Sequence, residues 1–220
     1  MHNSHQLTRD GSSTLFNDHF GETYHSRHGA IQESQHVFMD MAWNVLNPKP
    51  EILRIFEMGF GTGLNTLLAG LRANADQQQL SYTSLEAYPI SKPAQASLNY
   101  GEVLNGQALF NSIHEAAWNE EIQINDYFHL HKIETSLQDH DFGDNIFDIV
   151  FYDAFAPNSQ PELWTEPIFE KLYAHMREGS ILTTYCAKGD VRRAMKAVGF
   201  KTERAQGPPG KREMLRATKL

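Results

Sequence analysis

One segment constrains the fold more than any other, because a strand, a glycine-rich turn and a helix follow one another without a gap. The strand is predicted over Ile52 to Met58 (ILRIFEM), the turn over Gly59 to Gly63 and the helix over Leu64 to Ala73. Glycines let a backbone turn sharply and approach a ligand closely. In open α/β sheets, ligands bind beyond the carboxyl ends of the strands. The segment therefore predicts an α/β protein with a ligand site at the end of this strand.

The rest of the chain continues to alternate between strand and helix patterns. Further strands are predicted at Ser81 to Glu86, Tyr127 to Ile133, Ile146 to Tyr152 and Ile181 to Tyr185. Helices are predicted from the end of the second strand through Tyr100, then at Gly106 to Trp118, Pro167 to Arg177 and Gly189 to Val198. Such alternation indicates a mostly parallel, doubly wound sheet with right-handed crossovers. Phe200 to Ala205 and Glu213 to Thr218 flank a GPPG turn and predict a C-terminal hairpin that adds one antiparallel strand at the edge.

Residues 1–45 are predicted to form a flank that packs on a main domain of residues 46–220. An Asp10-Gly11 turn between short extended pieces is typical of a β-hairpin. After it, Gln32 to Leu46 has a helical pattern that ends at Asn47-Pro48. The flank is thus expected to contain one hairpin and one helix.

Composition limits the class of protein. With 220 residues, the chain is long enough to bury one sizeable core. The N-terminus is polar and has no apolar stretch of signal-peptide length, and no run approaches the ~20 apolar residues that span a bilayer. Cys186 is the single cysteine, which excludes a disulfide framework and cysteine zinc fingers. We therefore expect no membrane association and a cytoplasmic location.

The formal net charge of −8 is unevenly distributed. From Lys188 onward there are ten basic and three acidic residues, whereas the preceding 187 residues carry nine basic and twenty-four acidic ones. An acidic body argues against indiscriminate nucleic-acid binding, but a basic C-terminal segment can contact a phosphate backbone on one side. A solvated basic face without a partner explains the same charge equally well.

The glycine turn indicates which kind of cofactor binds. Gly59, Gly61 and Gly63 have the spacing GxGxG, and Leu64 occupies the third glycine position of the dinucleotide fingerprint GxGxxG. Glu57 precedes the turn, and a carboxylate there repels a pyrophosphate but attracts the cationic methionine part of S-adenosylmethionine (SAM). An NAD-dependent oxidoreductase is disfavoured for both reasons.

A second carboxylate supports the same cofactor. Glu86 ends the second predicted strand, where a carboxylate can accept hydrogen bonds from both ribose hydroxyls of a nucleoside. The glycine turn alone is a weak signal, and a structural turn with two solvent-facing acids remains the alternative. Together, Glu57, Glu86 and the turn predict a SAM site.

Asp153 follows the strand Ile146 to Tyr152, which ends in FYDAFAP beside the predicted cofactor site. An ammonium group has no lone pair, so a carboxylate that orients it and accepts or relays its proton suits methyl transfer to an amine. The position alone is equally compatible with a carboxylate that braces a loop. Asp153 is the candidate catalytic residue.

Several motifs in order resemble those of one family. EMGFGTGLN, DAFAPNSQPELWT, TYCAKGDVRRAMKAVGF and GPPGKREML are similar to the methyltransferase half of the bifunctional tRNA-modifying MnmC family, which also has stand-alone members. YHSRHGAIQES in the flank is similar to the family's N-terminal segment, so the resemblance covers about Leu7 to Ala217. It implies a Rossmann-like class I methyltransferase fold and SAM-dependent methylation of 5-aminomethyl(-2-thio)uridine at the tRNA wobble position.

The resemblance also implies roles for individual residues. The implied cofactor contacts are Glu57, Gly59, Phe60, Gly61, Gly63, Asn65 and Glu86. Asp153 is implied as the catalytic acid–base residue, and Tyr24 and Ser26 as lining the access route of the amine. An acidic contact to the adenine is not obvious, although Glu134 lies near the expected position. No flavin-dependent oxidase half is present in the pattern, so we expect the aminomethyl substrate to come from elsewhere.

Basic, aromatic and histidine residues elsewhere in the chain bear on RNA and metal binding. The candidates for holding the anticodon stem-loop are Lys188, Arg192, Arg193, Lys211 and Arg212. The pair Arg192 and Arg193 near the start of a predicted helix, and the pair Lys211 and Arg212 after the hairpin tip, could both reach outward. Phe155 and Trp164 could stack on a flipped-out uridine, although aromatic residues in such places more often belong to the core or anchor a loop. The pairs His25 with His28 and His129 with His131 lack a third ligand, so no metal is expected.

Two further interpretations remain open on the sequence alone. One is an aminopropyltransferase or small-molecule N-methyltransferase on the same fold, which suits the acidic surface and predicts indifference to ionic strength. The other is a non-catalytic RNA-binding protein that retains the fold, although the intact glycine turn and Asp153 argue against it.

Overall fold

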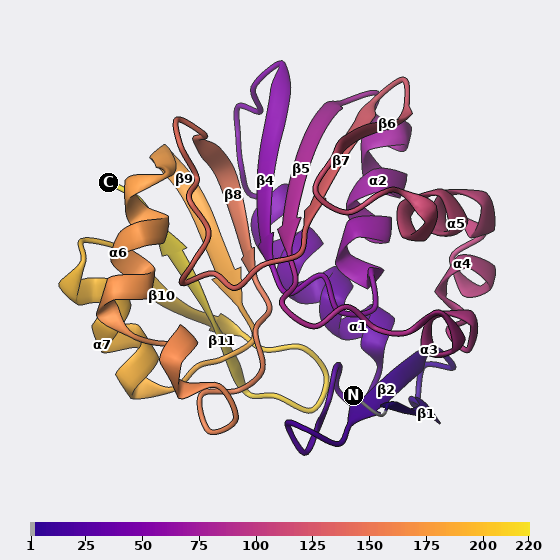
Figure 1. Ribbon diagram of the computed structural model, residues 1–220. Helices are drawn as coiled ribbons and strands as arrows, with labels where there is room; N and C mark the ends of the chain where they lie inside the picture. The colour runs from indigo at the N-terminus through magenta and orange to yellow at the C-terminus, as the bar shows by residue number, and fades with distance from the viewer. Residues whose placement is uncertain (1–2) are drawn as a thin grey trace.

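The computed structural model describes residues 3–220, which form a large central sheet and a small second sheet (Figure 1). The central sheet has eight strands in the order β10-β11-β9-β8-β4-β5-β7-β6. They are β4 (Ile52–Met58), β5 (Gln79–Leu85), β6 (Glu121–Asn125), β7 (Phe128–Ile133), β8 (Phe147–Tyr152), β9 (Met176–Thr184), β10 (Lys201–Gln206) and β11 (Glu213–Thr218). β4, β5, β7, β8 and β9 pair in parallel, which confirms the predicted α/β fold with a mostly parallel sheet.

The two edges of the sheet differ from the prediction. β11 pairs antiparallel with both β9 and β10, so the antiparallel strand lies inside the sheet and β10 forms the edge. At the other edge, β6 pairs antiparallel with β7 and was not predicted. Its sequence, EIQIN, leaves no residue buried, because an edge strand needs little apolar surface. A strand of this kind gives a weak hydrophobic pattern.

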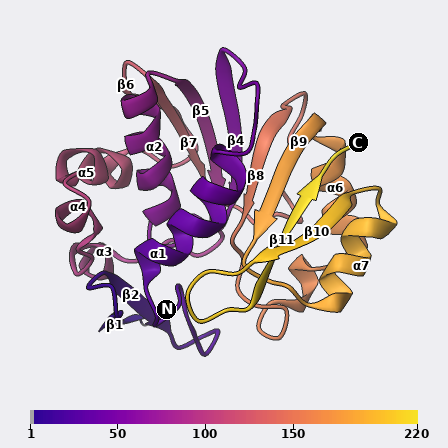
Figure 2. The ribbon, with the colours of Figure 1, turned by 180° about the vertical axis from the view of Figure 1, so that it is seen from behind.

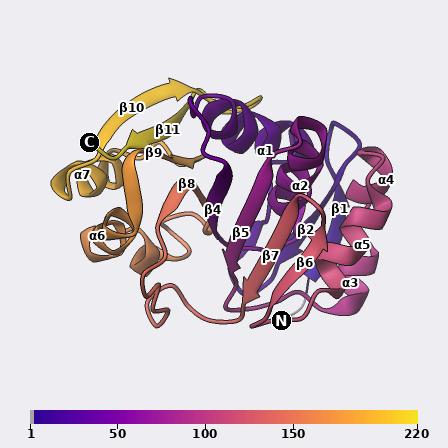
Figure 3. The same ribbon diagram turned by 90° about the horizontal axis from the view of Figure 1, so that it is seen from above.

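Helices cover both faces of the sheet, as Figures 2 and 3 show. One face packs against α1 (Ala30–Ser34), η1 (Gln35–Trp43), α2 (Leu64–Asp76) and α5 (Gln107–Glu115), which share one hydrophobic core with it. The opposite face packs against α6 (Glu166–Ala174) and α7 (Gly189–Ala197) around a second core. The remaining helical turns are α3 (Lys92–Ala96), α4 (Tyr100–Val103) and η2 (Pro161–Leu163).

Several helix boundaries differ from those predicted. The helix expected over Gln32 to Leu46 begins at Ala30, and from Gln35 onward it has π-helical register, as the bond from the Asn44 amide to the Met39 carbonyl shows. The helix expected to reach Arg177 ends at Ala174, because β9 begins at Met176. Apolar residues in a strand that follows closely extend an apparent helical period, so the pattern alone misplaces such an end.

The small sheet consists of β1 (Asn3–Leu7), β2 (Ser13–Asn17) and β3 (Glu22–Thr23). β1 and β2 form the predicted hairpin, with Leu7 opposite Ser13. This sheet lies at the lower right in Figure 1, on the side of the molecule to which the loops after β4, β5 and β8 project. Within residues 3–220, no helix has the length and apolar character that crossing a bilayer requires.

The order of the strands defines where a ligand can bind. After β4 the chain passes to β5 on one side, and β8 later returns to pair with β4 on the other. The loops that follow β4 and β8 therefore diverge at their carboxyl ends, which is where open α/β sheets form a binding crevice. Gly59 follows β4 there, and Asp153 follows β8.

Candidate active site

The glycine turn needs its glycines. Gly59 has φ +92°, and a Cβ at that position would lie 2.8 Å from the carbonyl oxygen of Asp153. Gly61 has φ +50°, and a Cβ there would lie 2.9 Å from the Tyr24 ring. Both conformations are costly for residues with side chains. The turn is thus packed between the loop after β8 and the N-terminal flank.

A cavity of about 400 Å³ opens beside this turn, within the range of small-molecule sites of about 300–1,000 Å³. The predicted site residues that line it are Tyr24, Ser26, Gly59, Phe60, Gly61, Asn65, Glu86, Asp153, Phe155 and Lys211. The cavity thus brings together most of the predicted cofactor and acceptor residues. Glu57 and Gly63 do not line it, although both belong to the segment that forms its floor.

Glu86 fixes the loops on one side of the cavity. Its Oε2 accepts a hydrogen bond from the Gly61 amide at 2.9 Å, and its Oε1 accepts one from the Tyr88 amide at 2.9 Å. Burial raises the pKa of the Glu86 carboxyl, and the backbone donors oppose this shift. Each oxygen retains a second lone pair, so Glu86 can still accept hydrogen bonds from a ligand hydroxyl.

Glu57 is completely buried directly below the turn. Its Oε2 accepts hydrogen bonds from Ser84 at 2.6 Å and Thr66 at 3.0 Å, whereas Oε1 has no hydrogen-bond partner. Burial raises the pKa of Glu57 to about 8, and the nearby Asp153 adds to this shift. A buried acceptor without a donor costs free energy. Glu57 Oε1 is therefore an acceptor that a hydrogen-bond donor reaching below the turn would satisfy.

Asp153 lies at the floor of the cavity, between the loops after β4 and β8. The Asn65 side-chain amide donates a hydrogen bond to Asp153 Oδ2 at 2.8 Å, while Asn65 Oδ1 is buried without a partner. Burial raises the pKa of Asp153 to about 7, Glu33 adds to the shift, and Asn65 and Lys211 oppose it. A carboxyl with this pKa can exchange a proton near neutral pH.

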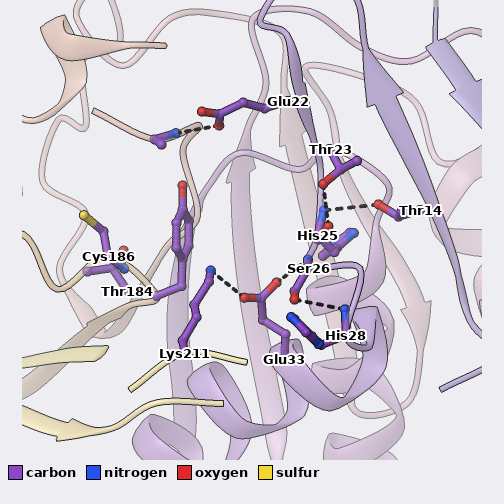
Figure 4. A network of polar contacts seen from close by, with 12 residues as sticks. Thr14, Glu22, Thr23, His25, Ser26, His28, Glu33, Thr184, Cys186 and Lys211 are labelled. Carbon is purple, nitrogen blue, oxygen red and sulfur yellow. Dashed lines mark hydrogen bonds and ion pairs between the residues drawn. The ribbon is translucent and has the colours of Figure 1, made fainter. Parts of the chain in front are cut away.

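An ion pair closes the cavity on the side of the flank, as Figure 4 shows. Lys211 Nζ lies 2.7 Å from Glu33 Oε1 and 3.9 Å from the centroid of the Tyr185 ring. Glu33 Oε2 also accepts a hydrogen bond from the Ser26 amide at 2.7 Å. The prediction that Lys211 reaches outward is wrong, because a buried carboxylate and an aromatic face bind its ammonium group inside the cavity.

The other predicted RNA-binding residues lie outside the cavity. Lys188 is exposed and donates a hydrogen bond to Asn158 Oδ1 at 2.6 Å. Arg193 is exposed and forms an ion pair with Asp190, Arg192 is half-buried, and Arg212 is exposed. None of these four side chains lines the cavity, so the cavity does not gather them into a single RNA-binding surface.

The structure also describes the surroundings of Trp164, of Glu134 and of the possible metal ligands. Trp164 is buried and its indole donates a hydrogen bond to the Phe155 carbonyl at 2.8 Å, so it anchors a loop. Glu134 is exposed and does not line the cavity. Among the described residues, no three His, Cys, Asp or Glu side chains gather in a way that could hold a metal ion.

Sequence reasoning missed several residues that shape the cavity. Glu33, Tyr185, Glu22 and Phe20 all line it. Glu33 carried a usable signal, because it shares the helical spacing of the buried residues Ala30 and Val37 and is therefore a carboxylate on an apolar helix face. The others are brought in by tertiary contacts between distant segments.

Comparison with known proteins agrees with this geometry. Residues 102–220 match the family Methyltransf_30, described as S-adenosyl-L-methionine-dependent methyltransferase. The tRNA 5-methylaminomethyl-2-thiouridine biosynthesis bifunctional protein MnmC of Actinobacillus pleuropneumoniae is 27% identical, over 95% of this chain and 34% of that protein. MnmC of Delftia acidovorans is 29% identical, over 93% of this chain and 33% of that protein. The chain thus spans about a third of the length of these relatives.

A solved structure shows the same fold. The crystal structure of MnmC2 from Aquifex aeolicus superimposes with a TM-score of 0.78 at 23% identity, covering 99% of this chain and 70% of that chain. The family match extends over more than half of the sequence and includes the segment that carries Asp153 and Lys211. The chain belongs to this family of S-adenosyl-L-methionine-dependent methyltransferases.

Proposed function

We propose that this enzyme transfers the methyl group of SAM to the primary amine of 5-aminomethyl(-2-thio)uridine at the wobble position of tRNA. The observation that carries the proposal is the placement of Asp153, a half-buried carboxyl whose desolvation raises its pKa to about 7, in the same cavity as the glycine turn. The MnmC relatives, whose name refers to 5-methylaminomethyl-2-thiouridine biosynthesis in tRNA, support this acceptor.

The residues around the glycine turn fit the cofactor. Glu57 Oε1 and Asn65 Oδ1 are buried acceptors without donors, and the amino group of the methionine part would supply donors. We assign Glu86 to the ribose hydroxyls, and Gly59, Phe60 and Gly61 to contacts along the turn. Gly63, outside the cavity wall, would support the turn from the start of α2. SAM supplies a methyl group on a positively charged sulfur, which a neutral amine attacks directly.

Asp153 is the group that we assign to the acceptor. The aminomethyl group is protonated in water and must lose a proton before its nitrogen can attack. Asp153 would bind the ammonium, accept its proton and hold the neutral amine in line with the methyl group, since positioning supplies much of the rate enhancement. Asn65 orients Asp153 through its hydrogen bond. Tyr24 and Ser26 would line the access route on the flank side.

The RNA would extend from the cavity over the outer surface. Lys188, Arg192, Arg193 and Arg212 remain our candidates for phosphate contacts, because they lie outside the cavity in the basic C-terminal segment. We also retain the division into a flank of residues 1–45 and a methyltransferase domain of residues 46–220. The flank nevertheless contributes Tyr24, Ser26 and Glu33 to the cavity wall, so we expect it to be required for activity.

Incubation with methyl-labelled SAM tests the proposal. The acceptors are an anticodon stem-loop that carries 5-aminomethyluridine, the same stem-loop with unmodified uridine, and free small amines such as putrescine. We expect label only in the first, as 5-methylaminomethyluridine identified by mass spectrometry after digestion. Label in the free amines but not in RNA would replace tRNA by a small-molecule acceptor. Asp153→Asn, with SAM binding verified separately, is the inactive control.

A further inference from the structure

Aromatic rings from four separate loops lie around the mouth of the cavity. They are His19 and Phe20 between β2 and β3, Tyr24 after β3, Tyr88 after β5 and Phe155 after β8. Neighbouring rings in this set lie with centroids 4.4 to 6.1 Å apart. Tyr88 is 45% exposed, and Phe20 and Phe155 are half-buried. A cluster of accessible rings at a cavity mouth commonly marks a binding surface.

Phe20 and Phe155 form the closest pair. Their ring centroids are 4.4 Å apart and the ring planes differ by 26°, so the two rings are stacked. Both rings line the cavity, although their positions in the sequence are 135 residues apart. Phe155 also lies two residues after Asp153 and contacts the Tyr24 ring edge-on at 5.1 Å. The stack therefore lies on the side of the cavity that carries the catalytic carboxylate.

Each ring is held by its own loop. Asn17 Oδ1 accepts hydrogen bonds from the amides of His19 at 2.9 Å and Phe20 at 3.2 Å, which fixes the turn that carries Phe20. The Phe155 amide donates to Gln160 Oε1 at 3.1 Å, and the Phe155 carbonyl accepts from Trp164. Fixed loops reduce the entropy that is lost when the rings bind a ligand.

A carboxylate ties the two loops to each other. Glu22, which follows the turn of Phe20, accepts hydrogen bonds from the Ser159 hydroxyl at 2.8 Å and the Ala156 amide at 3.3 Å. Both of these donors belong to the loop of Phe155. These two hydrogen bonds hold the flank against the loop after β8, close to the place where the rings of Phe20 and Phe155 stack.

We propose that Phe20 and Phe155 form an aromatic clamp that takes the pyrimidine ring of the acceptor nucleotide between them, so that Phe20 is a substrate-binding residue. This inference rests on the proposed function and names the residues that recognise its acceptor. A planar ring between two others requires a centroid separation of about 7 Å, twice the usual contact distance. The two rings must therefore separate by a few ångströms when the base enters, through rotation of the Phe20 side chain while the hydrogen bonds of Asn17 and Glu22 keep the backbone of both loops in place. Stacking between aromatic side chains is the usual way in which proteins hold an unpaired base.

The clamp discriminates between kinds of acceptor. An aliphatic amine has no flat face to fill the space between two parallel rings, whereas a uracil ring that carries an aminomethyl group does. The cofactor's nucleoside is expected next to the clamp, where Glu86 accepts a hydrogen bond from the Tyr88 amide and the Tyr88 ring lies 5.9 Å from the Phe20 ring between centroids. This arrangement assigns Tyr88 to the cofactor side and the stack of Phe20 and Phe155 to the acceptor side.

Substitutions at Phe20 test the clamp. Phe20→Ala removes the ring, Phe20→Leu retains apolar bulk without a flat face, and Phe20→Tyr retains the ring. Stacking of one base is worth about 1–3 kcal/mol, so we expect Phe20→Ala and Phe20→Leu to lower kcat/KM for the 5-aminomethyluridine stem-loop by roughly 5- to 150-fold, mainly through KM. Phe20→Tyr should stay close to the wild type. Tyr127→Ala, a half-buried ring on the β6–β7 turn, is the matched control and should change nothing.

The cofactor affinity of each variant and the activity of the wild-type enzyme separate the possible outcomes. The dissociation constant of S-adenosylhomocysteine, measured by calorimetry, should stay within about twofold of the wild type in each variant. A wild-type enzyme that methylates the stem-loop, together with unchanged kcat/KM in Phe20→Leu, would refute the clamp alone. Equal losses in cofactor affinity and kcat/KM would assign Phe20 to the cofactor instead. A wild-type enzyme that does not methylate RNA at all would refute the proposed function and the clamp with it.

Discussion

The two sides of the cavity are built in different ways. The cofactor side consists of the glycine turn after β4 and of Glu86 after β5, two neighbouring strand ends within 30 residues of sequence. The acceptor side combines the N-terminal flank, the loop after β8 and the C-terminal Lys211, which are each separated by more than 50 residues of sequence. One side is thus encoded locally, whereas the other exists only when distant segments have folded together.

This difference explains which parts of the site could be predicted. A positive φ and a close backbone approach require glycine whatever the rest of the fold does, so Gly59 and Gly61 are visible in the sequence. The ion pair between Glu33 and Lys211 joins a helix of the flank to a loop near the C-terminus, and no local pattern couples the two. Charge counting therefore placed Lys211 on the surface, since an unpaired lysine is usually solvated.

Asp153 connects the two sides, and its substitution has the largest expected effect. Asp153→Asn retains the hydrogen-bonding shape but cannot accept a proton, so we expect turnover to fall by roughly 100-fold or more while SAM affinity changes little. Single-turnover methylation and calorimetry measure the two quantities. Asp126→Asn, on an exposed turn, serves as the control. Unchanged turnover in Asp153→Asn would remove Asp153 from the catalytic role.

Gly59→Ala tests the local side. The strained φ and the contact with the Asp153 carbonyl should together weaken SAM binding by roughly 30-fold, from the 1–3 kcal/mol that such strain typically costs. Gly143→Ala is the matched control, because Gly143 also has a positive φ, +55°, but an added Cβ meets nothing within 4 Å. Both variants should lose some thermal stability, and only Gly59→Ala should lose cofactor affinity. Equal affinities would mean that the turn tolerates a side chain and is not closely packed.

The fold as a whole was more predictable than its edges. Buried parallel strands such as β8 are apolar at nearly every position, with Asp148 as the exception, and leave a strong pattern, and β4 is followed by a glycine-rich turn. The edge strand β6 and the insertion of β11 between β9 and β10 leave no comparable signal, because polar edge residues satisfy both a strand and a loop. Strand order is a property of tertiary packing, which local propensity does not determine.

Glu57 provides a pH test of the cofactor side. Its pKa is about 8 in the folded protein, above its ordinary value of 4.5. A raised pKa of a carboxyl stabilises the fold at low pH, and this contribution is lost as the pH rises from about 4.5 through 8. Within that window the free energy of unfolding of the wild type, relative to Glu57→Gln, should fall by up to about 1.4 kcal/mol per pH unit. Urea unfolding of both proteins without cofactor at pH 5, 6.5 and 8 measures the slope.

The outcome also bears on how the cofactor binds. Glu134→Gln, at an exposed carboxylate, should show no such difference from the wild type. If the difference in free energy of unfolding between Glu57→Gln and the wild type were the same at every pH, the Glu57 carboxyl would have an ordinary pKa and burial would not hold it neutral. With SAM bound, the cationic amino group should favour the charged carboxylate, so the pH dependence of the wild type should become shallower.

Lys211→Met tests the non-local side and has the smallest expected effect. Lys211 lowers the pKa of Asp153, whereas Glu33 raises it, so the loss of the lysine charge leaves Glu33 unopposed. Asp153 must be deprotonated to accept the substrate's proton, and the acidic limb of the kcat profile should therefore move from near pH 7 to higher pH. We expect a roughly fivefold loss of kcat at pH 7, recovered at pH 9, with SAM affinity unchanged.

Arg212→Met, the exposed neighbour, is the matched control: it should leave the pH profile in place and instead lower the salt dependence of RNA binding. An unmoved pH profile in Lys211→Met would show that the Glu33–Lys211 pair only holds the flank in position, and the acceptor side would then influence catalysis by shape alone.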